Sequence, residues 1–412
     1  METVVRYGAG SSVELDLPDG SLLADCELPL RPALEDTAAA VGAALAEPLE
    51  FPALARGTTP GDRVVLALDR DVPQAAEIVA STIEYLVGSG VEPDGISVLV
   101  ARSENPTGDL RGAWPAKWKS RVAVAEHDPA DQRRLAYLAR SESGESVFLN
   151  RLLTEADVVL PIGAVRPRTA AGYYGVHSVI FPTFSNQRAV MRYRTGDALR
   201  PRGRHTAHLV EEVAEVAWLL GITFTIQAVP AGGDRLLDVL AGDPAAVEAR
   251  GREVYDAGWH CLVPERAGLV VAAIEGGQGE QTWQNVGRAV AAASRLVEED
   301  GAIALCCGVT AEPGPGVQSL AEVADPREAL HRIRKARPDD ALAATQLVRS
   351  LMQSKVYLLS GLDPSLVEQL NMVPLAAPGE LVRLAHRYRS CIVLANAPHA
   401  AVKVRAESNG RA

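Results

Sequence analysis

RVVLALDRDVPQAAEIVASTIEYLVGSG (residues 63–90) is the stretch of sequence that decides the fold. It begins with an apolar run in which hydrophobic residues do not alternate with polar ones, which is typical of a strand buried on both faces of a parallel sheet. A segment with helical spacing follows at once, PQAAEIVASTIEYLVGSG (73–90). A buried strand that leads directly into a helix predicts an α/β protein.

The same alternation continues along the chain. Further helical stretches stand at HLVEEVAEVAWLLG (208–221) and WQNVGRAVAAASRLVEEDG (283–301). Apolar runs predict eight more strands, at residues 96–101, 122–126, 157–163, 224–230, 269–275, 302–308, 355–361 and 391–398. We therefore expect mainly parallel sheets flanked by helices.

A chain of 412 residues is too long for one ordinary core, so more than one domain is expected. The proline-containing connector WHCLVPERAG (259–268) precedes a new series of strands and helices. We expect an N-terminal domain over residues 1–262 and a C-terminal α/β domain over residues 263–412. The first 50 residues differ from the rest and predict a short β segment that caps the first sheet.

Charge and composition limit the classes of partner. The formal net charge is 41 − 52 = −11, which argues against nucleic acid or an anionic membrane as a main partner. The N-terminus has no signal-peptide pattern and no apolar run approaches 18 residues, so we expect a cytoplasmic protein. Lysine is absent from residues 120–334, which removes lysine-based covalent catalysis from the middle of the chain.

The chain has five cysteines, with no CxxC pair and no metal-ligand spacing. An odd number with apolar neighbours predicts reduced, buried thiols. The adjacent pair Cys306-Cys307 lies within a predicted strand and is interpreted as core.

In sheets of this class, ligands bind beyond the carboxyl ends of the strands. The residues that follow the predicted strands form a rim rich in arginine. We expect the binding pocket in the cleft between the two domains.

Taken in order, these strand ends resemble the nickel-dependent lactate racemase family. The resemblance rests on segments such as GDRVVLALDRDVPQ (61–74), ISVLVARSENPTG (96–108) and FLNRLLTEADVVLPIGAVRPRTAAGYYGVHSVIFPTFSN (148–186). It implies a lactate-racemase-like fold of two α/β domains with the site in the interdomain cleft. It also implies a nickel-pincer nucleotide tethered to a lysine, a histidine on nickel, and two histidines that act as acid and base on a 2-hydroxy acid.

The residues that carry this chemistry in the family are replaced here. Ser178 stands where the tethering lysine would be, and a serine hydroxyl cannot form the thioamide link. The two acid/base histidines fall on Asn105 and Arg168, and the nickel histidine falls at or near Arg194. We therefore expect no covalently held cofactor, so that a nickel-pincer nucleotide could be held only non-covalently. The positions matched to the cofactor loop and its surroundings are Asp69, Gly172, Tyr173, Gly175 and Ser178.

Arginine side chains offer planar, forked donors suited to carboxylate or phosphate. The expected substrate- or anion-binding residues are Arg70, Arg168, Arg194, Gln284 and Asn105, with Arg166 and Arg192 nearby. By the resemblance, Arg288 is adjacent to the position of a lysine that the family has and this chain lacks. The alternative is that these arginines form ion pairs with local acids such as Asp69, Asp71 and Glu104. His177 is a weak candidate for a relocated nickel ligand or base, and its alternative is a packed residue. His127 and Asp128 favour a turn or capping role.

Three functions follow from these observations. The first is an anion-binding relative of the family, for a small hydroxy or keto acid or a phosphorylated ligand, with or without turnover. The second is an active racemase or epimerase of 2-hydroxy acids that holds the cofactor non-covalently. The third is a catalytically dead subunit that associates with an active family member, and a homo-oligomer is a further alternative for assembly.

Overall fold

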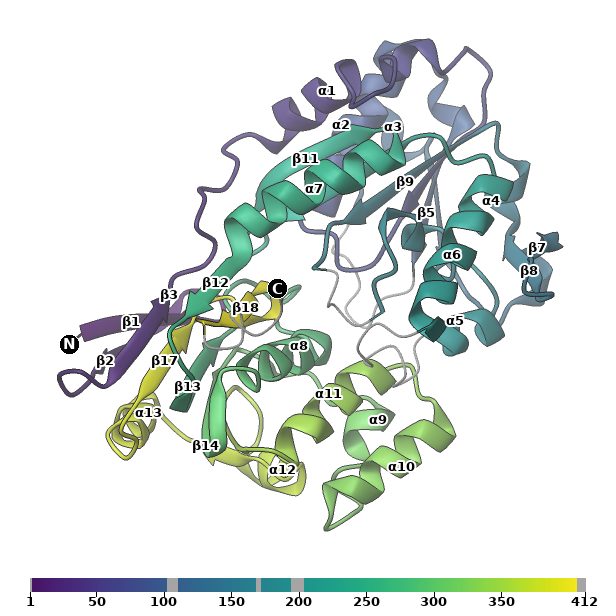
Figure 1. The fold of residues 1–412 in the computed structure, drawn as a ribbon. Coiled ribbons are helices and arrows are strands. Elements are labelled where there is room, and N and C mark those ends of the chain that lie inside the picture. Colours follow the sequence, from purple (N-terminus) through teal and green to yellow (C-terminus); the bar gives the residue numbers. More distant parts are fainter. Residues whose placement is uncertain (1, 102–109, 168–171, 194–203, 406–412) are drawn as a thin grey trace.

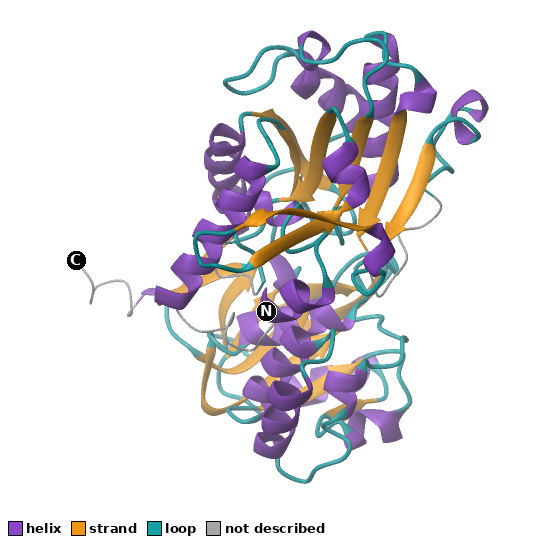
Figure 2. Ribbon diagram, turned by 90° about the vertical axis from the view of Figure 1, so that its right-hand side faces the viewer, coloured by secondary structure: helices purple, strands orange, loops and turns teal. Residues whose placement is uncertain are grey.

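The structure is a computed structural model that describes residues 2–101, 110–167, 172–193 and 204–405. It has two lobes, each built on a six-stranded sheet with helices on both faces (Figures 1 and 2). The predicted α/β class and all nine predicted strands are confirmed, with ends that differ by a few residues.

The first sheet has the strand order β11-β10-β9-β4-β5-β6. All its neighbours pair in parallel except β10 and β11. One face packs on α1 and α2. The other face packs on α6 and on the segment of residues 172–184, which contains Gly172 and Gly175 and is called the glycine loop here. Its strands are β4 (Val64–Leu68), β5 (Ile96–Ala101), β6 (Ala123–His127), β9 (Val158–Ala164), β10 (Thr225–Pro230) and β11 (Leu236–Gly242). The helices of this lobe are α1 (Thr37–Ala46), α2 (Ala75–Gly88), α3 (Ala116–Lys119), α4 (Arg151–Glu155), α5 (Gln187–Tyr193), α6 (Arg204–Leu219) and α7 (Pro244–Trp259).

The second sheet has the order β16-β15-β14-β13-β17-β3 and is parallel throughout. Its strands are β3 (Leu22–Cys26), β13 (Ala267–Ala273), β14 (Val297–Cys306), β15 (Lys355–Leu359), β16 (Val373–Leu375) and β17 (Cys391–Leu394). Its helices are α8 (Trp283–Ala293), α9 (Pro315–Gln318), α10 (Pro326–Ala336), α11 (Ala341–Leu351), α12 (Pro364–Gln369) and α13 (Pro378–Ala385). Figure 1 shows α8 and α11 on the side of this lobe that faces the first.

Three two-stranded ribbons complete the fold. Two are antiparallel and one is parallel. They are β1 (Glu2–Tyr7) with β2 (Ser11–Asp16), β7 (Leu135–Arg140) with β8 (Ser146–Asn150), and β12 (His260–Val263) with β18 (Ala401–Val404).

The N-terminal β segment does not cap the first sheet, and that prediction is wrong. The β1–β2 ribbon packs on the second sheet, where Val5 and Leu15 share a core cluster with Val271. Strand β3 then pairs in parallel with β17 and becomes the edge of that sheet. The chain therefore starts in the second lobe, builds the first lobe and returns, so the residues before α1 lie apart from the rest of the expected domain 1–262.

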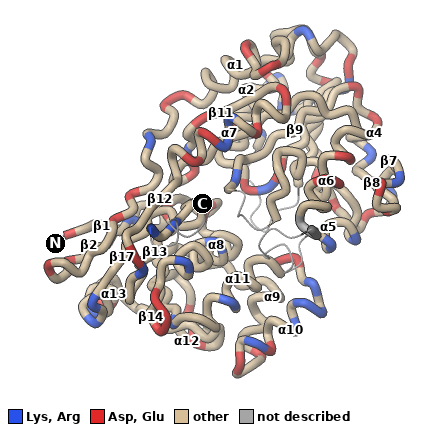
Figure 3. Tube along the Cα trace, viewed as in Figure 1, with Lys and Arg blue, Asp and Glu red and all other residues tan. Residues whose placement is uncertain are grey.

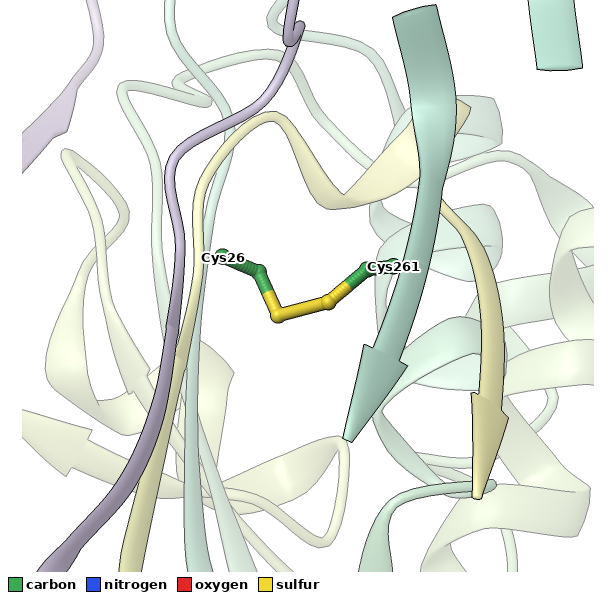
Figure 4. Close-up of a disulfide and its surroundings, with 2 residues drawn as sticks. All are labelled: Cys26 and Cys261. Carbon is green, nitrogen blue, oxygen red and sulfur yellow. A yellow bond between two sulfur atoms is a disulfide. The ribbon is translucent and has the colours of Figure 1, made fainter. Parts of the chain in front are cut away.

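The prediction that all five cysteines are reduced is also wrong. Cys26 at the end of β3 and Cys261 in β12 form a disulfide, with their Cα atoms 6.3 Å apart (Figure 4). They are 235 residues apart in sequence and meet because β3 joins the second sheet beside the connector β12. Cys306, Cys307 and Cys391 are free and buried, as predicted.

No helix in the described part of the chain is long and apolar enough to cross a membrane. In the view of Figure 3, basic and acidic residues are interspersed over both lobes, and neither sign gathers on one of them.

Candidate functional site

The site begins where the strand order of the first sheet reverses. Strands β4 and β9 are neighbours at this point, although they are separated in sequence by β5 to β8. The residues beyond their carboxyl ends meet, since Arg166 Nη2 lies 3.4 Å from the carbonyl oxygen of Arg70. Such a switch point is the usual ligand crevice of an open α/β sheet.

Asp69 fixes the end of β4. Its backbone N–H donates to the carbonyl of Ile162 in β9 (2.9 Å), and its carboxylate accepts from the Arg70 N–H (2.8 Å). Burial raises the pKa of Asp69, and the charges of Arg70 and Arg166 offset only part of that rise. Asp69 thus ties the two strand ends together and holds Arg70 at the rim.

The second lobe contributes Arg288 from α8. This helix starts with a cap in which the Thr282 hydroxyl accepts from the Asn285 N–H at 3.1 Å. Asn285 then accepts a hydrogen bond from Arg288 Nη1 at 3.0 Å. Arg288 Nε is buried and has no hydrogen-bond partner in the structure.

Arg166 and Arg288 approach each other from different lobes. Burial, and then the charge of Arg166, lower the pKa of Arg288 to about 10. The charges of Asp71 and Glu280 act in the opposite direction on the pKa of Arg288. Within the described parts of the chain, no ion pair of Arg70, Arg166 or Arg288 is found. Asp69 accepts from the backbone N–H of Arg70 and feels the charge of its guanidinium. Asp71 has interactions of its own and Glu104 lies outside the described residues, so the ion-pair alternative stays a prediction.

Two tyrosines flank the arginine pair. Tyr173 is half-buried, and burial followed by the charge of Glu248 raises its pKa, against the charge of nearby Arg166. Tyr255 donates to the carbonyl of His399 at 2.6 Å, and burial raises its pKa despite Arg166 and Arg288. Both phenols therefore stay protonated at neutral pH.

The glycine loop closes back on itself at Ser178. Gly172 and Gly175 have φ of 75° and 93°, a region that favours glycine. The Ser178 hydroxyl donates to the Gly175 carbonyl at 2.6 Å within the short helix at Val176–Val179, and Ser178 is buried. A Cβ on Gly172 would lie 2.9 Å from Leu342 Cδ1, so this loop touches α11 of the second lobe.

His177 is half-buried beside α7. Burial lowers its pKa, and the carboxylates of Glu248 and Asp243 act in the opposite direction. Within the described ranges, no three His, Cys, Asp or Glu side chains gather in a group that could hold a metal ion.

Two other residues suggested by the sequence have structural partners. His127 is buried, with Nε2 2.8 Å from the Ser185 carbonyl and Nδ1 3.1 Å from the Asn150 amide. Arg192 forms an ion pair with Glu212, which is 2% exposed. These contacts pack the first lobe and leave no free group on His127.

The remaining predicted residues divide into two groups. Gln284 lies one helical turn before Arg288 in α8 and is half-buried. Asn105, Arg168 and Arg194 lie outside the described residues. The sequence placed Arg166 and Arg288 only near the expected anion set, and it did not suggest Tyr255. The position of Arg166 directly after a strand was the available signal, whereas nothing local marked Tyr255.

Arg288 also lines a cavity of about 870 Å³, together with Pro167, α8 and α11. A volume of this size is in the range of small-molecule sites.

Comparison with known proteins identifies relatives of the chain. Residues 7–204 match the family model of the lactate racemase N-terminal domain. Lactate racemase of Lactiplantibacillus plantarum is 24% identical over 334 residues, which cover 75% of this chain and 76% of that protein.

Two solved structures share the fold. The lactate racemase apoprotein from Thermoanaerobacterium thermosaccharolyticum superposes with a TM-score of 0.77 at 17% identity, covering 98% of this chain and all of that one. A protein from Thermotoga maritima gives a TM-score of 0.67 at 12% identity, covering 91% of this chain and all of that one.

Proposed function

We propose that this chain is a relative of the lactate racemases, as the match of residues 7–204 to the lactate racemase N-terminal domain supports, and that it binds a small organic anion between its two lobes. The ligand is a hydroxy or keto acid or a phosphorylated compound. It is bound without a covalently tethered nickel-pincer nucleotide.

The observation that carries this proposal is the Arg166–Arg288 pair. Two guanidinium groups that approach each other at a partly buried site repel, and each loses hydration there. A bound anion would relieve both costs, and a forked guanidinium matches the geometry of carboxylate and phosphate. Arg70 stands at the same strand ends, and no ion pair joins it to the residues that the structure describes.

The residues present do not fit the tethered cofactor of the family. The tether requires a lysine amine, and Ser178 at that position offers only a hydroxyl, which is bonded to Gly175. The sequence has no lysine between residues 120 and 334 that could replace it. We therefore assign no catalytic step to this site.

Ligand-dependent thermal unfolding tests the anion site. Lactate, pyruvate and phosphate are each titrated against the wild type, Arg288→Met and the control Arg334→Met, which removes an exposed arginine of α10. At about 100 times its dissociation constant, a ligand stabilises a protein by about 2.7 kcal/mol. We expect this stabilisation in the wild type and the control, and its loss in Arg288→Met.

Methionine replaces the buried cation with an apolar side chain of comparable length, which proteins often tolerate. Equal stabilisation of Arg288→Met and the wild type by every ligand would remove Arg288 from the site and overturn the proposal.

The rival functions give different results. Nickel and a cofactor absorbance that co-purify from a cofactor-producing host would favour a racemase with a non-covalently held cofactor. Stable co-elution with an active family member, without any ligand effect, would favour the role of a partner subunit.

A further inference from the structure

The cavity beside Arg288 is much larger than a lactate-sized acid requires. It has about 870 Å³, within the range of about 300–1,000 Å³ that holds drug-sized ligands. Its walls are α8 and α11, which the structure holds together at two points. A Cβ on Gly287 would lie 2.9 Å from Ala343 Cα, and the Ser294 and Ser350 hydroxyls are 2.8 Å apart. The cavity is thus bounded by fixed helices.

One face of α8 forms a cationic part of the cavity wall. Arg288 and Ala291 lie on this face of α8 and line the cavity together with Arg295 from the turn that follows the helix. The two arginines are seven residues apart in sequence, and Ala291 lies between them with a small side chain.

The facing helix adds polar groups. Gln346 of α11 is 9% exposed, its Oε1 is buried without a partner, and its amide makes no hydrogen bond to the described residues. Ser350 and Ser294 line the same space. Glu298, Glu299 and Asp300 from the start of β14 line the cavity and offer acceptors, and Arg266 and Arg349 add cationic donors. Apart from alanine, proline, Val297 and Met352, the lining side chains are polar.

The polar lining determines which kind of chain, beyond the carboxylate, the ligand can have. A hydrocarbon tail would leave the amide, hydroxyl and guanidinium groups without partners, and each unmatched group costs binding energy. Arg266 and Arg349 line the cavity as well as Glu298, Glu299 and Asp300, so its charges are mixed and a neutral chain with both donors and acceptors matches them. A neutral, hydroxylated chain can donate to Glu298 and Glu299 and accept from Arg295 and Gln346.

We propose that the cavity between α8 and α11 binds the hydroxylated chain of a sugar-acid-like ligand, whose carboxylate is held by Arg288. The proposal rests on the proposed function of the Arg166–Arg288 site and names its substrate class. The natural ligand is then a polyhydroxylated acid, and short acids occupy only the arginine end.

Calorimetric titration of the full chain with gluconate and with lactate tests the proposal. Ala291→Leu fills the cavity midway between the two arginines. Ala214→Leu, on the exposed face of α6, is the matched control. We expect gluconate to bind the wild type and the control at least tenfold more tightly than lactate does. Ala291→Leu should reduce gluconate affinity at least tenfold and leave lactate affinity unchanged.

Arg295→Met supplies a second test that leaves the helix packing intact, because Arg295 is exposed in the turn that follows α8. This variant should bind gluconate with severalfold lower affinity and lactate with unchanged affinity. Equal affinity of the wild type for both acids, or an equal loss of both in Ala291→Leu and Arg295→Met, would overturn the proposal and leave the arginine site standing. If neither acid binds, the proposed function itself fails, and the assignment of the cavity fails with it.

Discussion

Arg166, just past the end of β9, and Arg288, in α8, belong to different sheets, yet the charge of Arg166 contributes to lowering the pKa of Arg288. Ion pairs elsewhere in the described chain, such as Arg63 with Asp157, neutralise their arginines locally. Among the residues that the structure describes, Arg166 and Arg288 form no such ion pair, although the charges of Asp71 and Glu280 act on Arg288. An anion bound between these two arginines would therefore also stabilise the contact between the two lobes.

The first prediction concerns the cofactor tether. Intact-mass measurement after expression with the cofactor-making enzymes should give the bare polypeptide mass, because Ser178 cannot form a thioamide and its hydroxyl is bonded to Gly175. Ser178→Ala should give the same mass and lose about 1 kcal/mol of stability through the missing hydrogen bond. A covalent adduct that disappears in Ser178→Ala would contradict the interpretation of this position.

The second prediction concerns the ion pair between Arg192 and buried Glu212. Arg192→Met leaves a buried carboxylate unpaired and should lower the free energy of unfolding by about 3 kcal/mol or more. The exposed pair Arg188–Glu145, 3.2 Å apart, provides the control, and Arg188→Met should cost about 1 kcal/mol or less. Urea unfolding measures both. Similar losses in the two variants would mean that Glu212 is solvated in solution.

The same pair predicts a pH dependence. Burial raises the pKa of Glu212, but hydrogen bonds from Arg192 and Tyr193 outweigh it, so the pKa lies below the ordinary value of 4.5. The stabilisation is complete above that value and is lost as pH falls through the lower pKa of the folded protein. Between these two pKa values, the stability difference between wild type and Arg192→Met should shrink with decreasing pH. A difference that is constant through this range would argue against the assignment.

The third prediction concerns Cys26 and Cys261. Thiol titration of the denatured, unreduced protein should find three thiols, and reduction should raise the count to five. Because the disulfide closes a loop of 235 residues, its removal should cost about 5 kcal/mol in the chain-entropy model. Cys26→Ser with Cys261→Ser should unfold at the temperature of the reduced wild type. Five thiols before reduction would show that the bond does not form.

The fourth prediction compares two helical glycines. Gly287→Ala should destabilise the protein by about 1–3 kcal/mol, because its Cβ would lie 2.9 Å from Ala343 Cα and would force α8 and α11 apart. Gly42→Ala in α1 has no atom within 4 Å of the new Cβ and should be neutral or stabilise by about 0.5–1 kcal/mol. Thermal unfolding of both variants checks the pair. A neutral Gly287→Ala would show that the wall of the cavity can move.

The sequence by itself determined the strands and the fold class. Runs such as RVVLALD (63–69) are apolar on both faces, and this property is local, so it predicts a buried parallel strand without knowledge of its neighbours. The position of Arg166 directly beyond β9 could be inferred in the same way. So could the loss of a tethering amine at Ser178, since residue identity alone excludes it.

Only the tertiary structure decided which distant residues meet. Strand β3 joined the second sheet because the β1–β2 ribbon buries its apolar side against that sheet, and this pairing brought Cys26 to Cys261. Arg288 meets Arg166 because α8 faces the first lobe, which depends on how the two sheets pack rather than on either segment. Strand and helix periodicity report burial along one element, whereas contacts between elements depend on the packing of the whole chain.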